Sequence, residues 1–212
     1  MKKQGKLNPD LEKVCPFCDQ ELILPFGRSD APIAIIGEKA EISGSPYRRN
    51  FQDRPGMLNG IEQEPFRGEY ADVLWTAFEE VGIQDYTSNV QTLYLWGHAP
   101  TTAEGEFLWH RARAVRAASR AKIVLLAGDL VCRAIAGWPV SKVSGLWLEG
   151  VDGLTAKYVM AFPSPFSVYR GGMPGEIKLA IWKLVQEPEV RKIMGLPKQK
   201  EPADLLRHLL YR

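Results

Sequence analysis

Two groups of side chains in this 212-residue sequence are of types that could do chemistry. Cys15 and Cys18 stand in the Cys-x-x-Cys spacing, which supplies two thiolates and therefore half of a metal site. Glu38 and Glu41 follow a short apolar run, and carboxylates at such a place can stabilise a cation or orient a water molecule. Asn89 lies near the end of a second run and offers both a hydrogen-bond donor and an acceptor.

Four short segments predict the strands of a sheet that would position these groups. The first, residues 31–37, is a continuous apolar run, which is typical of a parallel strand buried on both faces. Segments with one apolar face separate the strands, as in right-handed βαβ crossovers. We therefore expect an α/β fold, a three-layer α/β/α sandwich around a central, mainly parallel four-stranded sheet. The expected strands span residues 31–37, 85–92, 122–128 and 157–162, and the expected helices span 69–82, 103–119, 129–136, 175–186, 188–195 and 202–211.

Ligands of open α/β sheets bind outside the carboxyl ends of the strands. Loops that begin at Gly37, Asn89, Gly128 and Phe162 should converge at that edge. The first of them, residues 38–68, is long and rich in Gly, Pro, Arg and Asn, and loops of this length in compact domains usually carry function. The site of this protein is therefore expected in these loops.

Composition and charge restrict the class of protein. Hydrophobic residues make up 45% and charged residues 25%, which is typical of a soluble globular domain and excludes a collagen-like, coiled-coil or wholly disordered chain. No apolar stretch is long enough to span a bilayer, and no apolar signal core follows the basic N-terminus, so we expect a cytoplasmic protein with no membrane partner. Three cysteines cannot form a closed disulfide set, which fits a reducing compartment. A net charge of +2 does not by itself identify a nucleic-acid-binding protein.

The order of elements predicts three parts in one monomeric chain. Residues 1–30 form an N-terminal segment that carries Cys-x-x-Cys and packs on the domain. Residues 31–187 form the α/β domain, and residues 188–212 form a helical C-terminal extension. No internal repeat and no low-complexity tract divides the chain further.

Five motifs, in order and at similar spacings, resemble those of the uracil-DNA glycosylase superfamily. Phe162-Pro-Ser-Pro-Phe-Ser-Val-Tyr-Arg-Gly171 is similar to the His-Pro-Ser-Pro-Leu-Ser segment of these enzymes and its Tyr-Arg-Gly continuation. Gly37-Glu-Lys-Ala-Glu41 resembles the water-activating Gly-Glu-Ala-Pro-Gly of the iron–sulfur branch. Pro65-Phe-Arg-Gly68 resembles its Pro-Phe-x-Gly, and Tyr86-Thr-Ser-Asn-Val90 its Tyr-x-x-Asn-Val. Leu125-Leu-Ala-Gly128 resembles its phosphate-contacting turn, so the resemblance covers about residues 10–187.

The resemblance implies a catalytic centre that hydrolyses the N-glycosidic bond of a base flipped out of DNA. An oxocarbenium-like sugar cation forms in this reaction, and a carboxylate stabilises it and orients water. Glu38 is favoured for this role by its position, and Glu41 is the alternative. Phe66 would stack on the flipped base and Asn89 would read its edge. The substrate-binding residues implied by the resemblance are Gly37, Phe66, Asn89, Phe162 and Ser164.

The resemblance also implies a DNA-binding surface made by the same loops. Phe166 occupies the position of the wedge that fills the space left by the flipped base. Backbone amides at the Pro163-Ser164 turn and at Gly128 would contact phosphates, since a helix N-terminus attracts anions. Arginines in these loops would supply affinity that is independent of sequence. The DNA-contacting residues expected in this way are Arg48, Arg49, Gly128, Pro163, Ser164, Phe166, Ser167 and Arg170, with Arg54 and Arg67 in the same loops.

The sequence departs from the family pattern at the residue that activates the leaving base. The family histidine donates a hydrogen bond to the uracil oxygen, and Phe162 stands in its place. Losing such a donor typically costs about 2.7–4 kcal/mol of transition-state stabilisation. Lys39 and Glu41 also stand where the iron–sulfur branch has small residues. Three alternatives therefore stay open: excision is weak, the leaving base is activated in another way, or the substrate is a base other than uracil. A bulky modified pyrimidine, such as hypermodified cytosine in phage DNA, is a second substrate class.

The cysteines depart from the pattern as well. Cys15 and Cys18 match the first cysteine pair of the iron–sulfur branch, but the second pair is missing, so the count excludes a four-cysteine cluster. His98 and His110 lie near the expected place of that pair, which makes a structural Cys2His2 zinc site possible. No cofactor is expected to be required for catalysis. Cys132 is expected to be a small buried apolar residue.

Two functions from different classes follow from these observations. The first is a monofunctional DNA glycosylase that leaves an abasic site and acts in repair or in defence against phage. The second is a DNA- or nucleotide-binding module of the same fold that is catalytically weak because the family histidine is absent. The appearance of abasic sites separates the two.

Overall fold

A four-stranded parallel sheet forms the centre of the molecule. In the computed structural model, the residues described are 12–39, 57–58, 61–62, 65–66, 69–83, 86–96, 104–169 and 171–197. The strand order is β4-β1-β5-β6, and all three neighbouring pairs run parallel. The fold is an α/β sandwich, as expected from the sequence. The strands of this sheet are β1 (Ile33–Lys39), β4 (Val90–Trp96), β5 (Ile123–Ala127) and β6 (Tyr158–Phe162), and a separate hairpin pairs β2 (Met57–Leu58) with β3 (Ile61–Glu62).

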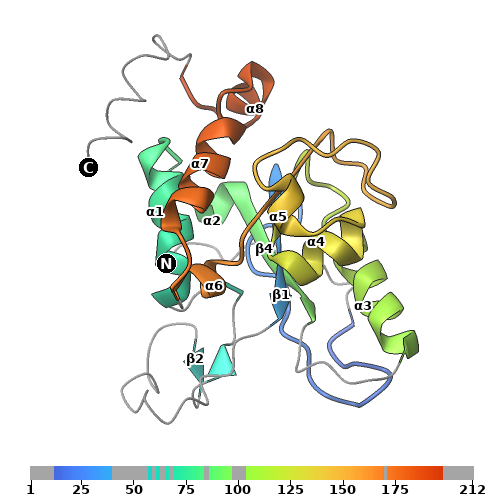
Figure 1. The fold of residues 1–212 in the computed structure, drawn as a ribbon. Helices are drawn as coiled ribbons and strands as arrows, with labels where there is room; N and C mark the ends of the chain where they lie inside the picture. The colour runs from blue at the N-terminus through green and yellow to red at the C-terminus, as the bar shows by residue number, and fades with distance from the viewer. Residues whose placement is uncertain are drawn as a thin grey trace, which may run out of the picture.

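Helices cover both faces of the sheet (Figure 1). One face carries η1 (Glu69–Ala71), α1 (Asp72–Glu80), α6 (Pro165–Tyr169), α7 (Pro174–Leu184) and α8 (Pro188–Ile193). The other face carries α3 (Glu104–Ala117), α4 (Asp129–Ala136) and α5 (Val140–Val143). A single turn, α2 (Tyr86–Asn89), leads into β4. Among the described residues, no helix is long and apolar enough to cross a membrane.

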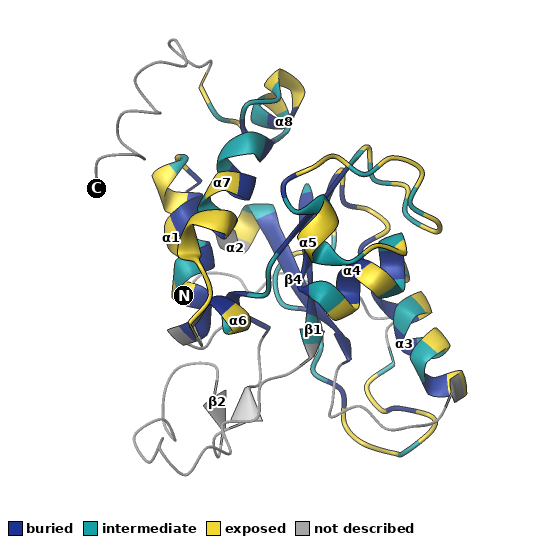
Figure 2. Cartoon of the chain, in the orientation of Figure 1, coloured by how far each residue is buried: buried dark blue, intermediate teal, exposed yellow. Residues whose placement is uncertain are grey.

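Both faces of each central strand are buried, which explains the continuous apolar runs in the sequence. Ile33 and Ile35 of β1 belong to the core under α1 and α7, whereas Ala34 and Ile36 belong to the core under α3 and α4. The same alternation, with its period of two residues, runs along β5. Figure 2 shows the strands of the central sheet as mostly buried, while the covering helices carry buried, intermediate and exposed residues.

The second strand lies further along the chain than the sequence pattern predicts. The expected strand at 85–92 is wrong, because residues 86–89 form α2 and β4 begins at Val90. All seven residues of β4 are buried, so the apolar segment from Leu93 to Trp96 belongs to the sheet. This shift changes which residue lies at the carboxyl end of the strand.

The segments before and after the expected domain join the same body. Phe26 pairs with Thr92 through two backbone hydrogen bonds of 2.8 Å, so the N-terminal segment extends the edge of the sheet at β4. Val190 and Met194, in and just after α8, lie in the core under α1 and α7. The core therefore continues beyond residue 187.

Candidate functional site

The carboxyl ends of the four strands bring the expected loops together. Tyr94, Gly37, Ala127 and Phe162 form one row across the sheet, because each is paired in register with its neighbour. The next residue on β1 is Glu38. The loops that begin at Gly37, Gly128 and Phe162 therefore start side by side at one edge of the sheet.

Glu38 is held in place by the turn that follows β5. Its Oε1 accepts a hydrogen bond of 2.8 Å from the backbone N–H of Leu130, in the first turn of α4. The N-terminus of a helix attracts negative charge, so this position suits an ionised carboxylate. The side chain is half-buried, which leaves part of the carboxylate open at the edge of the sheet.

Gly128 provides the space in which the Glu38 side chain packs. Gly128 has a φ of 117° and a ψ of 163°, a region that is essentially restricted to glycine. A Cβ atom there would lie 2.6 Å from the Cγ and Cδ of Glu38. Gly128 is buried and the Leu130 N–H that follows it donates to Glu38, while the predicted phosphate contact at Gly128 stays a prediction.

Replacing Gly128 with alanine is expected to displace Glu38. The strained backbone should cost about 1–3 kcal/mol of folding stability, and the new methyl group would collide with the carboxylate. Gly137→Ala is the matched control, because Gly137 also has a positive φ, 78°, but has open space at its Cβ position. Thermal unfolding and the excision assay proposed below check this prediction. An excision rate of Gly128→Ala equal to that of Gly137→Ala would contradict the role assigned to this contact.

Phe66 adopts a backbone conformation that bulky residues rarely occupy. Its φ is +60°. A conformation of this kind costs about 1–3 kcal/mol and persists only where contacts with the surrounding structure hold it. Its N–H donates to the hydroxyl of Tyr94 at 3.2 Å, and its carbonyl accepts from the indole of Trp75 at 2.9 Å. These contacts direct the Phe66 ring onto Gly37, where a Cβ atom would lie 2.5 Å from Phe66 Cζ. Such strain is typical of functional sites.

An aromatic cluster, defined as Phe66, Tyr70, Tyr94 and Phe166, connects the first long loop to the loop after β6. Phe66 packs on Tyr94 with ring centroids 5.4 Å apart, and the hydroxyls of Tyr70 and Tyr94 lie 2.5 Å apart. Phe166 meets the Tyr70 ring edge-on at 5.8 Å. Sequence reasoning missed Tyr70 and Tyr94. A correct end for β4 would have revealed Tyr94, because it is the strand residue beside Gly37.

Asn89 does not lie with the other predicted site residues. It precedes Val90, which is level with Ile33 at the start of β1, whereas Gly37 is level with Tyr94. Four residues of strand separate these two levels, or about 13 Å. Asn89 is therefore at the opposite end of the sheet from Glu38, so the expected convergence of its loop with the other three is wrong, and its role in reading a base stays a prediction.

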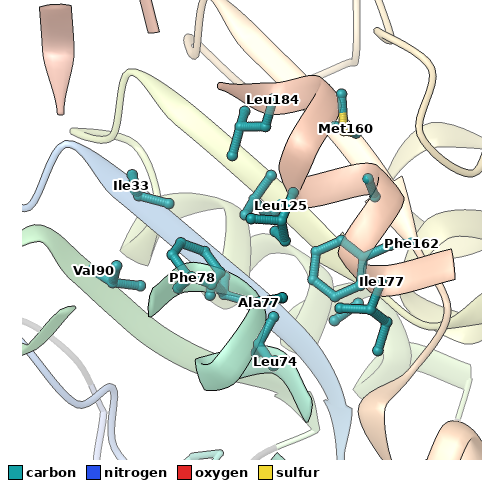
Figure 3. Packing of buried hydrophobic residues seen from close by; sticks show 14 of the residues in the cluster. Ile33, Leu74, Ala77, Phe78, Val90, Leu125, Met160, Phe162, Ile177 and Leu184 are labelled. Atoms are coloured by element: carbon teal, nitrogen blue, oxygen red, sulfur yellow. The ribbon is translucent and has the colours of Figure 1, made fainter. Parts of the chain in front are cut away.

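Phe162 is a core residue. Its ring is 0% exposed and packs beside Ile177 in the core under α1 and α7 (Figure 3). Its carbonyl oxygen accepts a hydrogen bond of 2.9 Å from Gly128 N–H, which joins the two loops at their starts. The Phe162 ring therefore faces the interior in the structure without DNA, and its predicted substrate contact stays a prediction.

The turn after β6 is built by its serines. Ser167 Oγ donates to the carbonyl of Ser164 at 2.7 Å, which closes the first turn of α6. Pro163 and Ser164 are half-buried, and Ser167 is exposed. Phe166 is half-buried against Tyr70. These residues lie near the strand ends, where the sequence places them. Five other predicted site residues fall outside the described residues: Glu41, Arg48, Arg49, His98 and Arg170. The same holds for Arg54 and Arg67 and for the side chain of Lys39.

A second group of side chains could hold a metal ion. One ligand atom from each of Cys15, Cys18 and Glu106 lies within 4.8 Å of the others. Sequence reasoning named both cysteines but missed Glu106, whose signal is its place on the predicted helix four residues before His110. Residues four apart on a helix share a face. The expected partner His98 falls outside the described residues.

Cys132 is separate from this group. It is buried in the core under α3 and α4, and burial raises the pKa of its thiol from an ordinary 9.0 to about 11. Because the folded-state pKa is raised, the associated stability is fully present below about pH 9 and is lost as the pH rises through about 11. We expect Cys132 to resist alkylation at pH 8 in the folded protein and to react after denaturation, as measured by mass spectrometry of the labelled peptide. Equal labelling in both states would contradict its burial.

No protein-family model and no curated protein matches the chain.

Proposed function

We propose that this protein is a DNA glycosylase that flips a damaged or modified base out of DNA and hydrolyses its N-glycosidic bond. The observation that carries the proposal is the placement of Glu38. The Glu38 carboxylate lies at the carboxyl end of β1 and is fixed by the Leu130 N–H, one residue after Gly37, on which the strained Phe66 packs. The reaction itself is inferred from the motifs that resemble those of glycosylases.

Glu38 would act on the sugar rather than on the base. As the bond from C1′ to the base nitrogen breaks, its electrons leave with the base and positive charge develops on the sugar. The carboxylate would stabilise that charge and accept a proton from the attacking water, whose oxygen bonds to C1′. The base takes up a proton, so the products are a free base and an abasic site.

Phe66 supplies an aromatic face for the extruded base. The ring is 2% exposed without DNA, so stacking requires the side chains that cover Phe66 to move away when the duplex binds. A glycosylase must in any case meet the cost of unstacking a base, and contacts to the DNA backbone provide that free energy. Phe166 contacts Tyr70, which contacts Tyr94, which in turn packs on Phe66. Insertion of Phe166 into the duplex would therefore move the residues around Phe66.

The leaving base would depart without help from a donor at position 162. The Phe162 ring has no hydrogen-bond donor and lies in the core, which disfavours uracil at the rate of the family enzymes. A base with a lower barrier to departure, such as an electron-poor modified pyrimidine, fits the site better. A DNA-binding module of the same fold is the second candidate, and the burial of Phe162 favours it.

A panel of duplex and single-stranded oligonucleotides tests the proposal. The panel carries uracil, hypoxanthine, deaminated cytosines and bulky modified cytosines, and alkali converts each abasic site to a strand break. Breaks at any one of these bases that require Glu38 would support a glycosylase and identify its substrate class. Binding to the panel with no breaks would favour the binding module.

A further inference from the structure

Four ligand-type side chains from two distant segments meet beside α3. Cys15 and Cys18 come from the N-terminal segment, and Glu106 and His110 stand one turn apart on α3. Cys15 Sγ lies 3.6 Å from Glu106 Oε1 and 3.8 Å from His110 Nε2. Glu106 Oε1 lies 3.9 Å from Cys18 Sγ and 3.7 Å from His110 Nε2.

These separations match those of a tetrahedral zinc site. Zinc bonds of about 2.3 Å to sulfur and about 2.0–2.2 Å to nitrogen or oxygen, at tetrahedral angles, place the donor atoms about 3.3–3.8 Å apart. None of the four distances joins two sulfur atoms, and they equal or exceed by up to about 0.4 Å the separations that tetrahedral zinc gives to sulfur–oxygen, sulfur–nitrogen and nitrogen–oxygen pairs. The donor set, two thiolates with an imidazole and a carboxylate, also suits zinc, which accepts sulfur, nitrogen and oxygen ligands.

A buried arginine supplies the charge that such a site requires. Two thiolates, one carboxylate and a neutral imidazole around Zn²⁺ leave a net charge of −1, and a buried net charge is costly unless it is balanced. Arg113 is one turn beyond His110 on α3 and is 1% exposed. Its guanidinium donates to the backbone carbonyl of Glu12 at 3.5 Å. Within the described part of the chain its Nε has no hydrogen-bond partner, so its hydrogen bonds alone do not explain why it is buried.

The surroundings bury three of the four donor residues, and the fourth, Cys18, is half-buried. The His110 ring packs against Trp96 at 4.6 Å and Trp109 at 4.8 Å, and Phe17, between the two cysteines, meets Trp109 edge-on. Gly105 allows this approach, because a Cβ there would lie 3.3 Å from the Phe17 ring. Glu106 and His110 are both fully buried. A closed site with four protein ligands is typical of structural zinc.

We propose that Cys15, Cys18, Glu106 and His110 together bind one structural zinc ion, with Arg113 balancing the charge of the centre. The ion would tie the N-terminal segment to α3. The inference is independent of the proposed glycosylase function, because its readouts are metal content and spectra rather than excision.

Metal analysis of the full chain, purified without chelator, is the first test. We expect roughly one zinc ion per chain and no iron–sulfur absorption. Replacement by Co²⁺ should give intense visible ligand-field bands and a thiolate-to-cobalt charge-transfer band, with quenching of fluorescence from the adjacent Trp96 and Trp109. Protein that lacks stoichiometric metal and gives no such bands with added Co²⁺ would overturn the proposal.

Variants of the proposed ligands distinguish a zinc centre from a cluster of thiols that are only hydrogen-bonded to Glu106 and His110. Glu106→Gln and His110→Ala should lower zinc content and shift the cobalt bands, whereas Cys132→Ser, which changes a cysteine outside the group, should leave both unchanged. Arg113→Met should weaken zinc binding about tenfold, and Arg113→Lys should restore much of it. Wild-type cobalt spectra that persist unchanged in Glu106→Gln and His110→Ala would exclude these two residues as ligands.

Discussion

Replacing Glu38 with glutamine is expected to lower the excision rate by about 10²–10⁴-fold while DNA binding is retained. The glutamine side chain keeps an oxygen that can accept the hydrogen bond from Leu130, so the geometry of the site should survive. It loses the negative charge that stabilises the sugar cation and the base that accepts the proton of water. Single-turnover excision of the best substrate in the panel, with fluorescence anisotropy for binding, measures both effects.

A carboxylate far from the strand ends provides the control for this variant. Glu79 is exposed on α1, and Glu79→Gln should leave excision, binding and stability unchanged. If Glu38→Gln excises at the wild-type rate, Glu38 is not the catalytic carboxylate and Glu41, the alternative from the motif, takes its place in the hypothesis.

Replacing Gly37 with alanine is expected to have the largest effect on stability. The new Cβ would lie 2.5 Å from Phe66 Cζ and 2.9 Å from two carbons of the Tyr94 ring. Neither ring can move easily, because Phe66 is anchored at its N–H and its carbonyl. Overpacking of this kind costs about 1–3 kcal/mol, and excision should fall as well because Phe66 is displaced. Chemical denaturation and the excision assay measure the two effects.

Gly175 offers a matched comparison for Gly37. It lies in α7 with nothing within 4 Å of its Cβ position, so Gly175→Ala should raise stability by up to about 1 kcal/mol through helix propensity. Wild-type stability and activity in Gly37→Ala would show that the close approach of Phe66 to Gly37 is not required.

The sequence predicts the sheet well where apolar runs are continuous and bounded. The strand at 31–37 overlaps β1, and the strands at 122–128 and 157–162 overlap β5 and β6 almost completely. The strand at 85–92 fails, because Tyr86 to Asn89 have no decisive period and the buried run that follows reads equally well as the start of a loop. That one boundary error moved Asn89 to the wrong end of the sheet and hid Tyr94.

The site residues differ in how much of their role can be recognised from the neighbouring sequence. Glu38 and Gly128 are recognisable from short motifs at strand ends, but their contact joins positions 90 residues apart and follows only from the β1–β5 pairing. Phe162 shows the reverse case, because its motif predicts a site position while the side-chain direction at the end of β6 points into the core. Glu106 stands four residues before His110 on one helix. This spacing indicates a metal site only once the structure places the cysteines beside α3.

The most direct test of the account uses a DNA probe that does not depend on which base is excised. A duplex with a cationic azasugar at the reacting position imitates the sugar cation, and a duplex with a neutral tetrahydrofuran abasic site is its control. If Glu38 stabilises that cation, the wild-type protein should bind the azasugar duplex about 100-fold or more tightly than the control, and Glu38→Gln should lose most of this preference. Equal affinity of the wild-type protein for the two duplexes would contradict a glycosylase centre at Glu38.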